Sequence, residues 1–341
     1  MQRFIVQLFR FSLIGLIPLI ILAIIYVILD PFKVIRSYSS YIDPKAKAWV
    51  SVNKDYQSTT TFINNSKTIN YNSFIFGSSR SIYYQISDWK KHLPANSSCY
   101  HFDASGESLW ALNKKVEFID KKGGKMENVL LVLDTALLAL DKPKKGHLFI
   151  TSPALLENDN IIEFQKTFFF AFLQPKFLYA YLDFKLTGEV KPYMTKNSLL
   201  DNKPRGYDLT TNEMRFDYFE NLIRQKKFYT KKRMSVFYKR PRFQKYSLPV
   251  IKENQKMLLE NIHSIFKKHN SDVRIVISPL YNQKKLNEKD LAYLKNLFGT
   301  ERVFDFSGIN KITNDYNNYY EASHYRPHVS RELMEIIYKG K

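Results

Sequence analysis

Short uninterrupted apolar runs, spaced by segments with a helical pattern, constrain the fold of this chain most strongly. The runs at residues 73–76 and 129–133 lack the alternation of a half-exposed strand, so both faces of each strand should be buried. A third run, at residues 273–277, stops before a proline. Helical patterns cover residues 250–270, 290–298 and 327–338. This alternation predicts an α/β domain with a mostly parallel sheet that helices cover on both faces.

Residues 145–248 interrupt this alternation of strand and helix patterns, and we predict that they form a helical insertion outside the sheet. The stretch 167–186 contains eight aromatic residues, and the stretch 224–245 contains ten basic residues and no acidic one. The aromatic part is expected to form a helical cap that buries its rings on the sheet, or to lie at a membrane interface. The basic part is either a binding surface for a polyanion or a solvated cationic face.

The N-terminal segment predicts a membrane anchor. Residues 11–29 form an uncharged run of 19 residues between Arg10 and Asp30, about the length of a helix that crosses a hydrocarbon core of roughly 30 Å. No small-x-small cleavage site follows, as it would in a signal peptide. We therefore expect a single transmembrane signal anchor at residues 1–32, a stalk leading into the domain at 33–70, and an extracytoplasmic domain at 71–341.

The charge and the cysteine content limit which classes of partner and which kinds of cross-link or metal site are possible. The formal net charge of +20, from 52 Lys and Arg against 32 Asp and Glu, is typical of a protein that binds nucleic acid or an anionic surface. With an anchor in the chain, an anionic lipid or glycan is the expected partner, and nucleic acid is not. The single cysteine, Cys99, excludes an intramolecular disulfide and a zinc site of several thiolates.

Two short segments carry residues for nucleophilic catalysis. The sequence Gly77-Ser78-Ser79-Arg80 follows the first apolar run, so a hydroxyl should lie at the carboxyl end of a sheet strand. Near the C-terminus, Glu321-Ala322-Ser323-His324 spaces an acid and an imidazole by three residues. A serine nucleophile needs a base, and that base needs a carboxylate to hold its tautomer. A serine of this turn, together with His324 and Glu321, is therefore a candidate triad, although a serine at such a turn also commonly caps a helix.

This layout resembles the SGNH (GDSL-type) hydrolase family, in particular its membrane-anchored envelope branch. That branch includes the alginate O-acetylation proteins and the D-alanyl transfer protein of teichoic-acid modification. The resemblance covers roughly residues 71–140 and 250–340 and implies a three-layer α/β sandwich. It also implies that Ser79 is the nucleophile and that the amides of Ser79 and Gly106 bind the oxyanion.

The chain departs from the family pattern at three positions. Ser78 and Glu321 stand where the family has aspartates, and Asp134 stands near the place of an oxyanion-binding asparagine. A carboxylate at Asp134 would repel an oxyanion unless it were protonated or turned away. Arg80 has two interpretations: it holds an anionic group of the substrate, or it pairs with a nearby acid.

The resemblance implies a bacterial membrane-anchored serine esterase or O-acyltransferase that acts on cell-envelope glycan without a metal or organic cofactor. A multispanning acyltransferase is a possible partner. The alternative is a non-catalytic envelope protein that binds a polyanion or a membrane partner through the basic insertion. A metal site of Glu321, His324 and His328 is a further alternative, but Pro327 interrupts it and no other ligand element accompanies it.

Overall fold

The computed structural model describes residues 2–43, 45–196, 199–203 and 206–339. The chain divides into two compact units, which are described separately below. One unit consists of Met1–Val52, Gly146–Leu148 and Asn158–Lys203. The other, which contains the sheet, consists of Asn53–Lys145, Phe149–Glu157 and Pro204–Lys341.

The central sheet has five strands in the order β2-β1-β3-β7-β9, and every neighbouring pair is parallel. The strands are β1 (Ser73–Gly77), β2 (Cys99–Asp103), β3 (Asn128–Leu133), β7 (Asp272–Ile277) and β9 (Val303–Asp305). This confirms the predicted α/β class and parallel sheet. Strands β1, β2 and β3 are buried throughout. The uninterrupted apolar runs predict this for β1 and β3, whereas β2 also carries His101 and Asp103.

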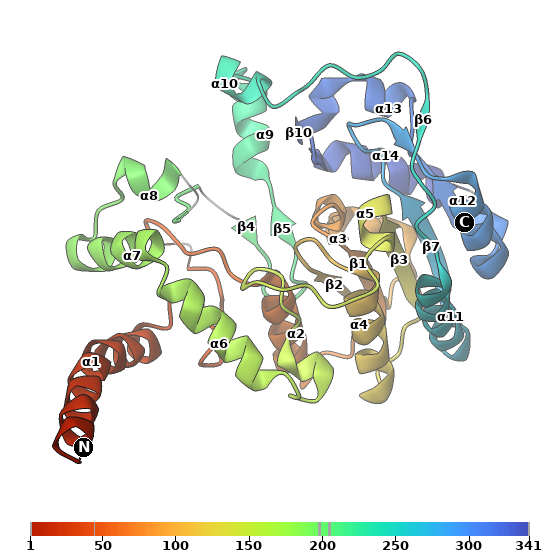
Figure 1. Cartoon of the computed structure of the whole chain (residues 1–341). Coiled ribbons are helices and arrows are strands. Elements are labelled where there is room, and N and C mark those ends of the chain that lie inside the picture. Colours follow the sequence, from red (N-terminus) through yellow and green to blue (C-terminus); the bar gives the residue numbers. More distant parts are fainter. Residues whose placement is uncertain (1, 44, 197–198, 204–205, 340–341) are drawn as a thin grey trace. The chain divides into compact units, whose positions relative to one another are not determined.

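Successive side chains on the strands point to opposite faces of the sheet, so each face has its own core. Phe74 and Phe76 of β1 pack into one core, whereas Ile75 packs into the other. The first face is covered by α2 (Lys54–Asn65), α4 (Leu109–Lys121), α11 (Glu253–Lys268) and α12 (Glu288–Phe298). The second is covered by η1 (Ser81–Tyr83), α3 (Ile86–Trp89) and α14 (Pro327–Ile337). Figure 1 shows α4 and α11 side by side on the first face.

Shorter elements complete the sheet unit. Its further helices are η2 (Lys90–His92), α5 (Thr135–Leu138), η3 (Pro153–Leu156), α9 (Asp217–Arg224), α10 (Lys231–Met234), η4 (Thr300–Arg302), α13 (Lys311–Asn314) and η5 (Tyr316–Asn318). Three small two-stranded pairs lie outside the central sheet: β4 (Gly206–Tyr207) with β5 (Met214–Arg215), β6 (Lys245–Tyr246) with β8 (Lys284–Lys285), and β10 (Tyr319–Glu321) with β11 (His324–Tyr325).

The other unit is built from α1 (Gln2–Leu29), α6 (Ile161–Phe172), α7 (Pro175–Thr187) and α8 (Pro192–Lys196). Aromatic side chains join the N-terminal segment to the insertion. The ring of Tyr26 lies 5.4 Å from those of both Phe169 and Phe172, and Phe32 stacks on Phe177 at 4.9 Å. The aromatic stretch of the insertion is therefore helical, as predicted, but its rings pack against the N-terminal segment.

No helix within the described part of the chain meets the length and apolarity needed to cross a membrane. The side chains of residues 11–15, which begin the run predicted as the anchor, lie outside the described residues.

The division of the chain differs from the one expected from the sequence. Residues 53–70 were expected to belong to a stalk and the entry into the domain, but α2 lies there and buries Phe62 against rings of β1 and β2. The predicted insertion at 145–248 is also divided, because most of its first half belongs to the N-terminal unit and residues 204–248 belong to the sheet unit. Composition alone did not show this division, since both halves are rich in aromatic and basic residues.

A buried charge cluster lies on the first face of the sheet unit. Lys115 of α4 is fully buried between Glu107, which accepts a hydrogen bond from its ammonium, and Asp55, whose Oδ2 is 3.2 Å from Nζ. One ammonium thus faces two carboxylates. Burial raises the pKa of Glu107 to about 7, against the opposing charge of Lys115 and with a further rise from Asp55.

The raised pKa of Glu107 predicts a pH dependence of folding. Between roughly pH 4.5 and 7 the folded chain binds more protons than the unfolded chain, so this group lowers stability as the pH rises through that window. Because glutamine does not titrate, the free energy of unfolding of Glu107→Gln relative to the native chain should rise from pH 5 to pH 8, on the order of 2 kcal/mol. Urea unfolding at both pH values measures it.

Glu117→Gln on the same helix is the matched control. Glu117 is partly buried, which raises its pKa, but hydrogen bonds from Lys114, Asn113 and Asn261 lower the pKa below its ordinary value overall. The contribution of Glu117 to stability is therefore lost only as the pH falls below this window. The free energy of unfolding of Glu117→Gln relative to the native chain should thus change little between pH 5 and pH 8. Equal pH slopes for the native chain and Glu107→Gln would contradict the assignment.

Candidate active site

Ser79 lies on a tight turn at the carboxyl end of β1. The strand ends at Gly77, where a Cβ would lie 2.6 Å from the carbonyl oxygen of Val132 on β3, so no residue larger than glycine fits without a shift. The chain then turns through Ser78 to Arg80 into η1, and the amide and hydroxyl of Ser81 both donate to the Ser78 carbonyl, at 2.9 and 2.8 Å. Ser78 is buried in this turn, whereas Ser79 remains partly exposed.

The hairpin β10–β11 brings the C-terminal acid and imidazole to this turn. The Nε2 atom of His324 lies 2.8 Å from the Oγ of Ser79, across 245 positions of sequence. The Nδ1 atom of His324 bonds Oε1 of Glu321, and the amide of Ser323 donates to Oε2 of Glu321 at 2.8 Å. The side chains of His324 and Glu321 are 28% and 30% exposed, so solvent and small molecules can reach the group.

The electrostatics of the hairpin favour a base that faces the serine. Burial raises the pKa of Glu321, but hydrogen bonding to His324 and to the Ser323 amide brings the pKa below its ordinary value overall. Glu321 is therefore ionised at neutral pH and accepts the hydrogen on Nδ1 of His324. This tautomer leaves the lone pair of Nε2 directed at the Ser79 hydroxyl.

Asp134 is turned away from an oxyanion-binding role. Its Oδ1 accepts from the amides of Ala136 and Leu137, at 2.8 and 3.1 Å, and so caps α5. Its Oδ2 accepts from Nη1 of Arg80 at 2.8 Å. Of the two interpretations of Arg80, the structure shows the pairing with a nearby acid. This ion pair joins the loops after β1 and β3 at the point where the strand order changes direction, which is where doubly wound sheets bind ligands.

Gly106 and His328 lie in different surroundings. Gly106 follows β2 at the same edge of the sheet, with φ of +55°, and its carbonyl accepts from Lys144 Nζ at 3.1 Å. Its proposed amide contact with an oxyanion stays a prediction. His328 bonds the Asn318 side chain at 2.8 Å. Among the described residues, no group of three or more His, Cys, Asp or Glu side chains is placed to hold a metal ion.

Sequence reasoning missed the aromatic surroundings of the imidazole. Tyr83, four residues after Ser79, places its buried ring 5.7 Å from that of His324 and an equal distance from that of Tyr320. The same ring lies 4.6 Å from that of Phe216 in the insertion. Only the aromatic type and the spacing from Ser79 could have suggested Tyr83, and neither is specific.

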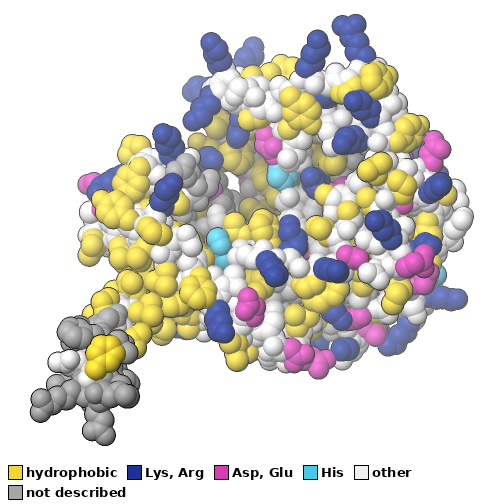
Figure 2. Space-filling model, in the orientation of Figure 1, with side chains coloured by type: hydrophobic (Ala, Val, Ile, Leu, Met, Phe, Trp, Pro, Cys, Tyr) yellow, Lys and Arg dark blue, Asp and Glu magenta, His cyan; other side chains and the backbone are white. Residues whose placement is uncertain are grey.

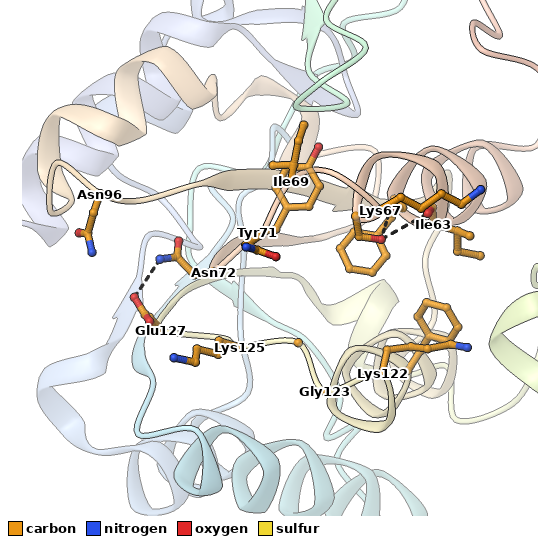
Figure 3. A pocket seen from close by; sticks show the side chains of 15 residues that line it. Ile63, Lys67, Ile69, Tyr71, Asn72, Asn96, Lys122, Gly123, Lys125 and Glu127 are labelled. Carbon is orange, nitrogen blue, oxygen red and sulfur yellow. Dashed lines mark hydrogen bonds between the residues drawn. The ribbon is translucent and has the colours of Figure 1, made fainter.

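A pocket of about 750 Å³ lies at the amino ends of β1 and β3, opposite the end of the strands where Ser79 lies (Figure 3). Asn72 and Glu127, whose side chains form a 2.9 Å hydrogen bond in its wall, directly precede β1 and β3. Gly123 and Lys125, which follow α4, line it as well. Because Ser79 follows the carboxyl end of β1 and Asn72 precedes its amino end, this pocket is separate from the Ser79–His324 pair.

The two functions of Asp134 can be separated by mutation. Asp134→Ala removes the cap of α5, worth about 1 kcal/mol, and deprives Arg80, which is 19% exposed, of its carboxylate, at a further ~1–3 kcal/mol. Asp134→Asn keeps a capping oxygen and should cost less. Guanidinium unfolding measures both. Asp141→Ala, which loses one exposed hydrogen bond from Asn254, should stay within about 0.5 kcal/mol. Equal losses for the two Asp134 variants would contradict a capping role.

Comparison with known proteins assigns no relative to this site. No family model matches the chain, and none of the curated proteins searched matches it either. The chemistry of the site is therefore inferred from its own geometry.

Proposed function

We propose that this protein is a serine esterase or O-acyltransferase of the SGNH type, acting on ester-linked acyl groups of cell-envelope glycan. The observation that carries the proposal is the 2.8 Å approach of Ser79 Oγ to His324 Nε2, with Glu321 bonded to the opposite ring nitrogen. A nucleophile, a base and an orienting carboxylate in this order are the requirements for acyl transfer through serine.

In the proposed reaction, Ser79 Oγ attacks the acyl carbonyl while His324 Nε2 takes the hydroxyl proton. The tetrahedral intermediate collapses, His324 returns the proton to the departing sugar oxygen, and the acyl group remains on Ser79. Water or a second sugar hydroxyl then gives its proton to His324 and attacks the acyl carbon. As the second tetrahedral intermediate collapses, the bond between the acyl carbon and Ser79 Oγ breaks and His324 returns the proton to that oxygen. Amides of Ser79 and Gly106 are the proposed donors to the oxyanion, and none of these steps needs a cofactor.

The sheet topology supports this assignment. Numbered along the chain, the five strands are ordered 2-1-3-4-5, and such sheets bind ligands at the carboxyl ends of the first and third strands. Ser79 and Asp134 follow those two strands. Helices on both faces are compatible with the three-layer sandwich that the family resemblance implies. The charge of Asp134 is compensated by Arg80 and the α5 amides, so it opposes the formation of an oxyanion less than a free carboxylate would.

The proposed setting is a bacterial membrane, with a single N-terminal span and the sheet unit on the extracytoplasmic side. This part of the proposal rests on the apolar run at residues 11–29 and on the family resemblance. The corresponding partner is a multispanning acyltransferase that supplies the acyl group. With such a partner, the protein would transfer the acyl group to a sugar hydroxyl and would not hydrolyse the ester.

A fluorophosphonate probe tests the nucleophile. The Oγ of Ser79 should form a bond to phosphorus, fluoride should leave, and His324 should take the proton. We expect in-gel labelling of the full chain, none for Ser79→Ala, and a rate for His324→Ala or Glu321→Gln lower by on the order of 100-fold or more. Ser78→Ala, a neighbouring buried serine, is the matched control and should keep labelling. An unlabelled native chain would contradict the proposal.

A second candidate function, binding of an anionic polymer or lipid surface, is favoured by the cationic cluster around α10. We define this cluster as Lys231, Lys232 and Arg233. Figure 2 shows Lys and Arg side chains gathered where Figure 1 places α10. The two lysines are exposed, and the Arg233 guanidinium lies 4.4 Å from the ring centre of Phe228. The charge of Arg233 also helps to lower the pKa of Glu321, which places the cluster near the catalytic hairpin.

Reversal of the α10 cluster tests this binding. Replacement of Lys231, Lys232 and Arg233 by Glu should weaken binding to vesicles of anionic phospholipid, on the order of 100-fold or more, because each basic residue near such a surface contributes about 1 kcal/mol. Added salt should reduce the difference. Reversal of Lys142, Lys145 and Lys289 is the control with equal charge change. Cosedimentation measures binding, and equal binding by the two triple variants would contradict a specific surface.

A further inference from the structure

One carboxylate of the insertion binds both sides of the catalytic hairpin. Glu220 lies on α9, and its Oε1 accepts from the hydroxyl of Tyr320 at 2.6 Å. Arg326 donates to the same carboxylate through Nε at 3.0 Å and through Nη2 at 2.6 Å. Tyr320 directly precedes Glu321, and Arg326 lies two residues after His324. Glu220 therefore bonds the chain on either side of the candidate acid and base.

Aromatic packing reinforces the same contact. The rings of Phe216, Phe219 and Phe228 lie 5.8, 5.6 and 5.6 Å from that of Tyr320. The hydroxyl of Tyr229 donates to the carbonyl of Tyr319 at 2.8 Å. Residues 216–229 thus contact the hairpin through side chains on both sides of Glu220. Mutual packing of this kind leaves the hairpin little freedom to move without the insertion.

The hairpin depends on such external contacts because it is short. Strand β10 has three residues and β11 has two, and their pairing shifts register between Tyr319 and Glu321. An isolated two-stranded hairpin is marginally stable in water. The pair is also a separate sheet and shares no strand with the central one. The position of His324 relative to Ser79 is thus decided by what packs on the hairpin.

The ionic state of Glu220 suits this role. Burial raises its pKa, but the hydrogen bonds from Arg326 and Tyr320 lower the pKa below its ordinary value overall. A bidentate hydrogen bond between a guanidinium and an ionised carboxylate is stronger and more directional than a hydrogen bond between neutral groups. The side chains of Arg326 and Glu220 are only 15% and 27% exposed, so water weakens the pair less than it would at the surface.

We propose that Glu220 is a positioning residue for the Glu321–His324 pair. Through Tyr320 and Arg326 it holds the hairpin at the distance where His324 meets Ser79, so the α9 segment of the insertion sets the reactivity of the serine. This inference rests on the proposed function for its catalytic consequence. A displacement of about 1 Å in a reacting group can cost on the order of 100-fold in rate, which is the scale of the effect expected here.

Two variants and two measurements on the full chain test this role. Glu220→Gln keeps the side-chain length and an acceptor for Tyr320 but loses the charge that binds Arg326, whereas Glu220→Ala loses both. With a fluorophosphonate probe, we expect the maximal inactivation rate to fall about tenfold for Gln and about 100-fold for Ala, at unchanged half-saturating probe concentration. Amide hydrogen exchange of residues 319–326 should become faster in the same order.

Asp88→Asn is the matched control. Asp88 accepts from Arg331 Nε at 3.0 Å and so joins α3 to α14 by an ion pair whose carboxylate is 10% exposed and whose guanidinium is 51% exposed. No hydrogen bond recorded for Asp88 among the described residues involves the hairpin. We expect this variant to leave both the inactivation rate and the exchange of residues 319–326 unchanged, even where it lowers the melting temperature.

The outcomes separate this role from general stability. Native inactivation and exchange in both Glu220 variants would overturn the inference and leave the proposed function intact. Equal effects of the Asp88 and Glu220 variants would also overturn it, since any lost ion pair would then suffice. A native chain that does not react with the probe would overturn the proposed function, and with it the catalytic part of the inference. Hydrogen exchange would then decide whether Glu220 holds the hairpin.

Discussion

The close parallel pairing of β1 with β3 is the constraint on which the site depends. Gly77, paired with Val132, brings the two backbones so close that a side chain at this position would strike the Val132 carbonyl. The strand ends there, and the next residues form the turn that presents Ser79. Because β1 lies between β2 and β3, the loops after these three strands meet at one edge of the sheet. The neighbours of Ser79 on that edge follow from this order.

Charges near that edge are consistently paired. Asp134, whose charge would otherwise oppose the oxyanion of the proposed reaction, directs one oxygen to the α5 amides and the other to Arg80. Deeper in the same unit, Lys115 bonds Glu107 and lies close to Asp55, although one ammonium cannot neutralise two carboxylates fully. Ionised side chains are tolerated in this core because each has an opposite charge or amide donors within bonding distance. The +20 net charge, by contrast, is carried largely by exposed lysines and arginines.

The β10–β11 hairpin, which carries the candidate acid and base, is held by side-chain packing and ion pairing, whereas the serine is held by the sheet. Ser79 is placed by a strand with partners on both sides, but Glu321 and His324 come from two very short strands outside that sheet. Tyr319 and Tyr325 of the hairpin are buried in the core of the second face, and Glu220, Tyr229 and the rings around Tyr320 add contacts from the insertion. The insertion, in which composition suggested a cationic surface at residues 224–245, thus also contacts the hairpin that carries the imidazole. The cationic cluster lies next to these contacts in the sequence, since α10 is the helix that follows α9.

The sequence alone determined those features that depend on residues close to one another along the chain. Uninterrupted apolar runs predicted β1, β3 and β7, because a strand buried on both faces needs apolar side chains at nearly every position. The turn after Gly77 and the spacing of Glu321 and His324 predicted which side chains could cooperate. Tertiary structure decided what depends on contacts between distant segments: the direction of the Asp134 carboxylate, the inclusion of α2 in the core, and the division of the insertion between two units. Such contacts leave no periodic trace in the sequence. Glu220 is an ordinary helix residue until folding places Tyr320 and Arg326, a hundred residues away, against it.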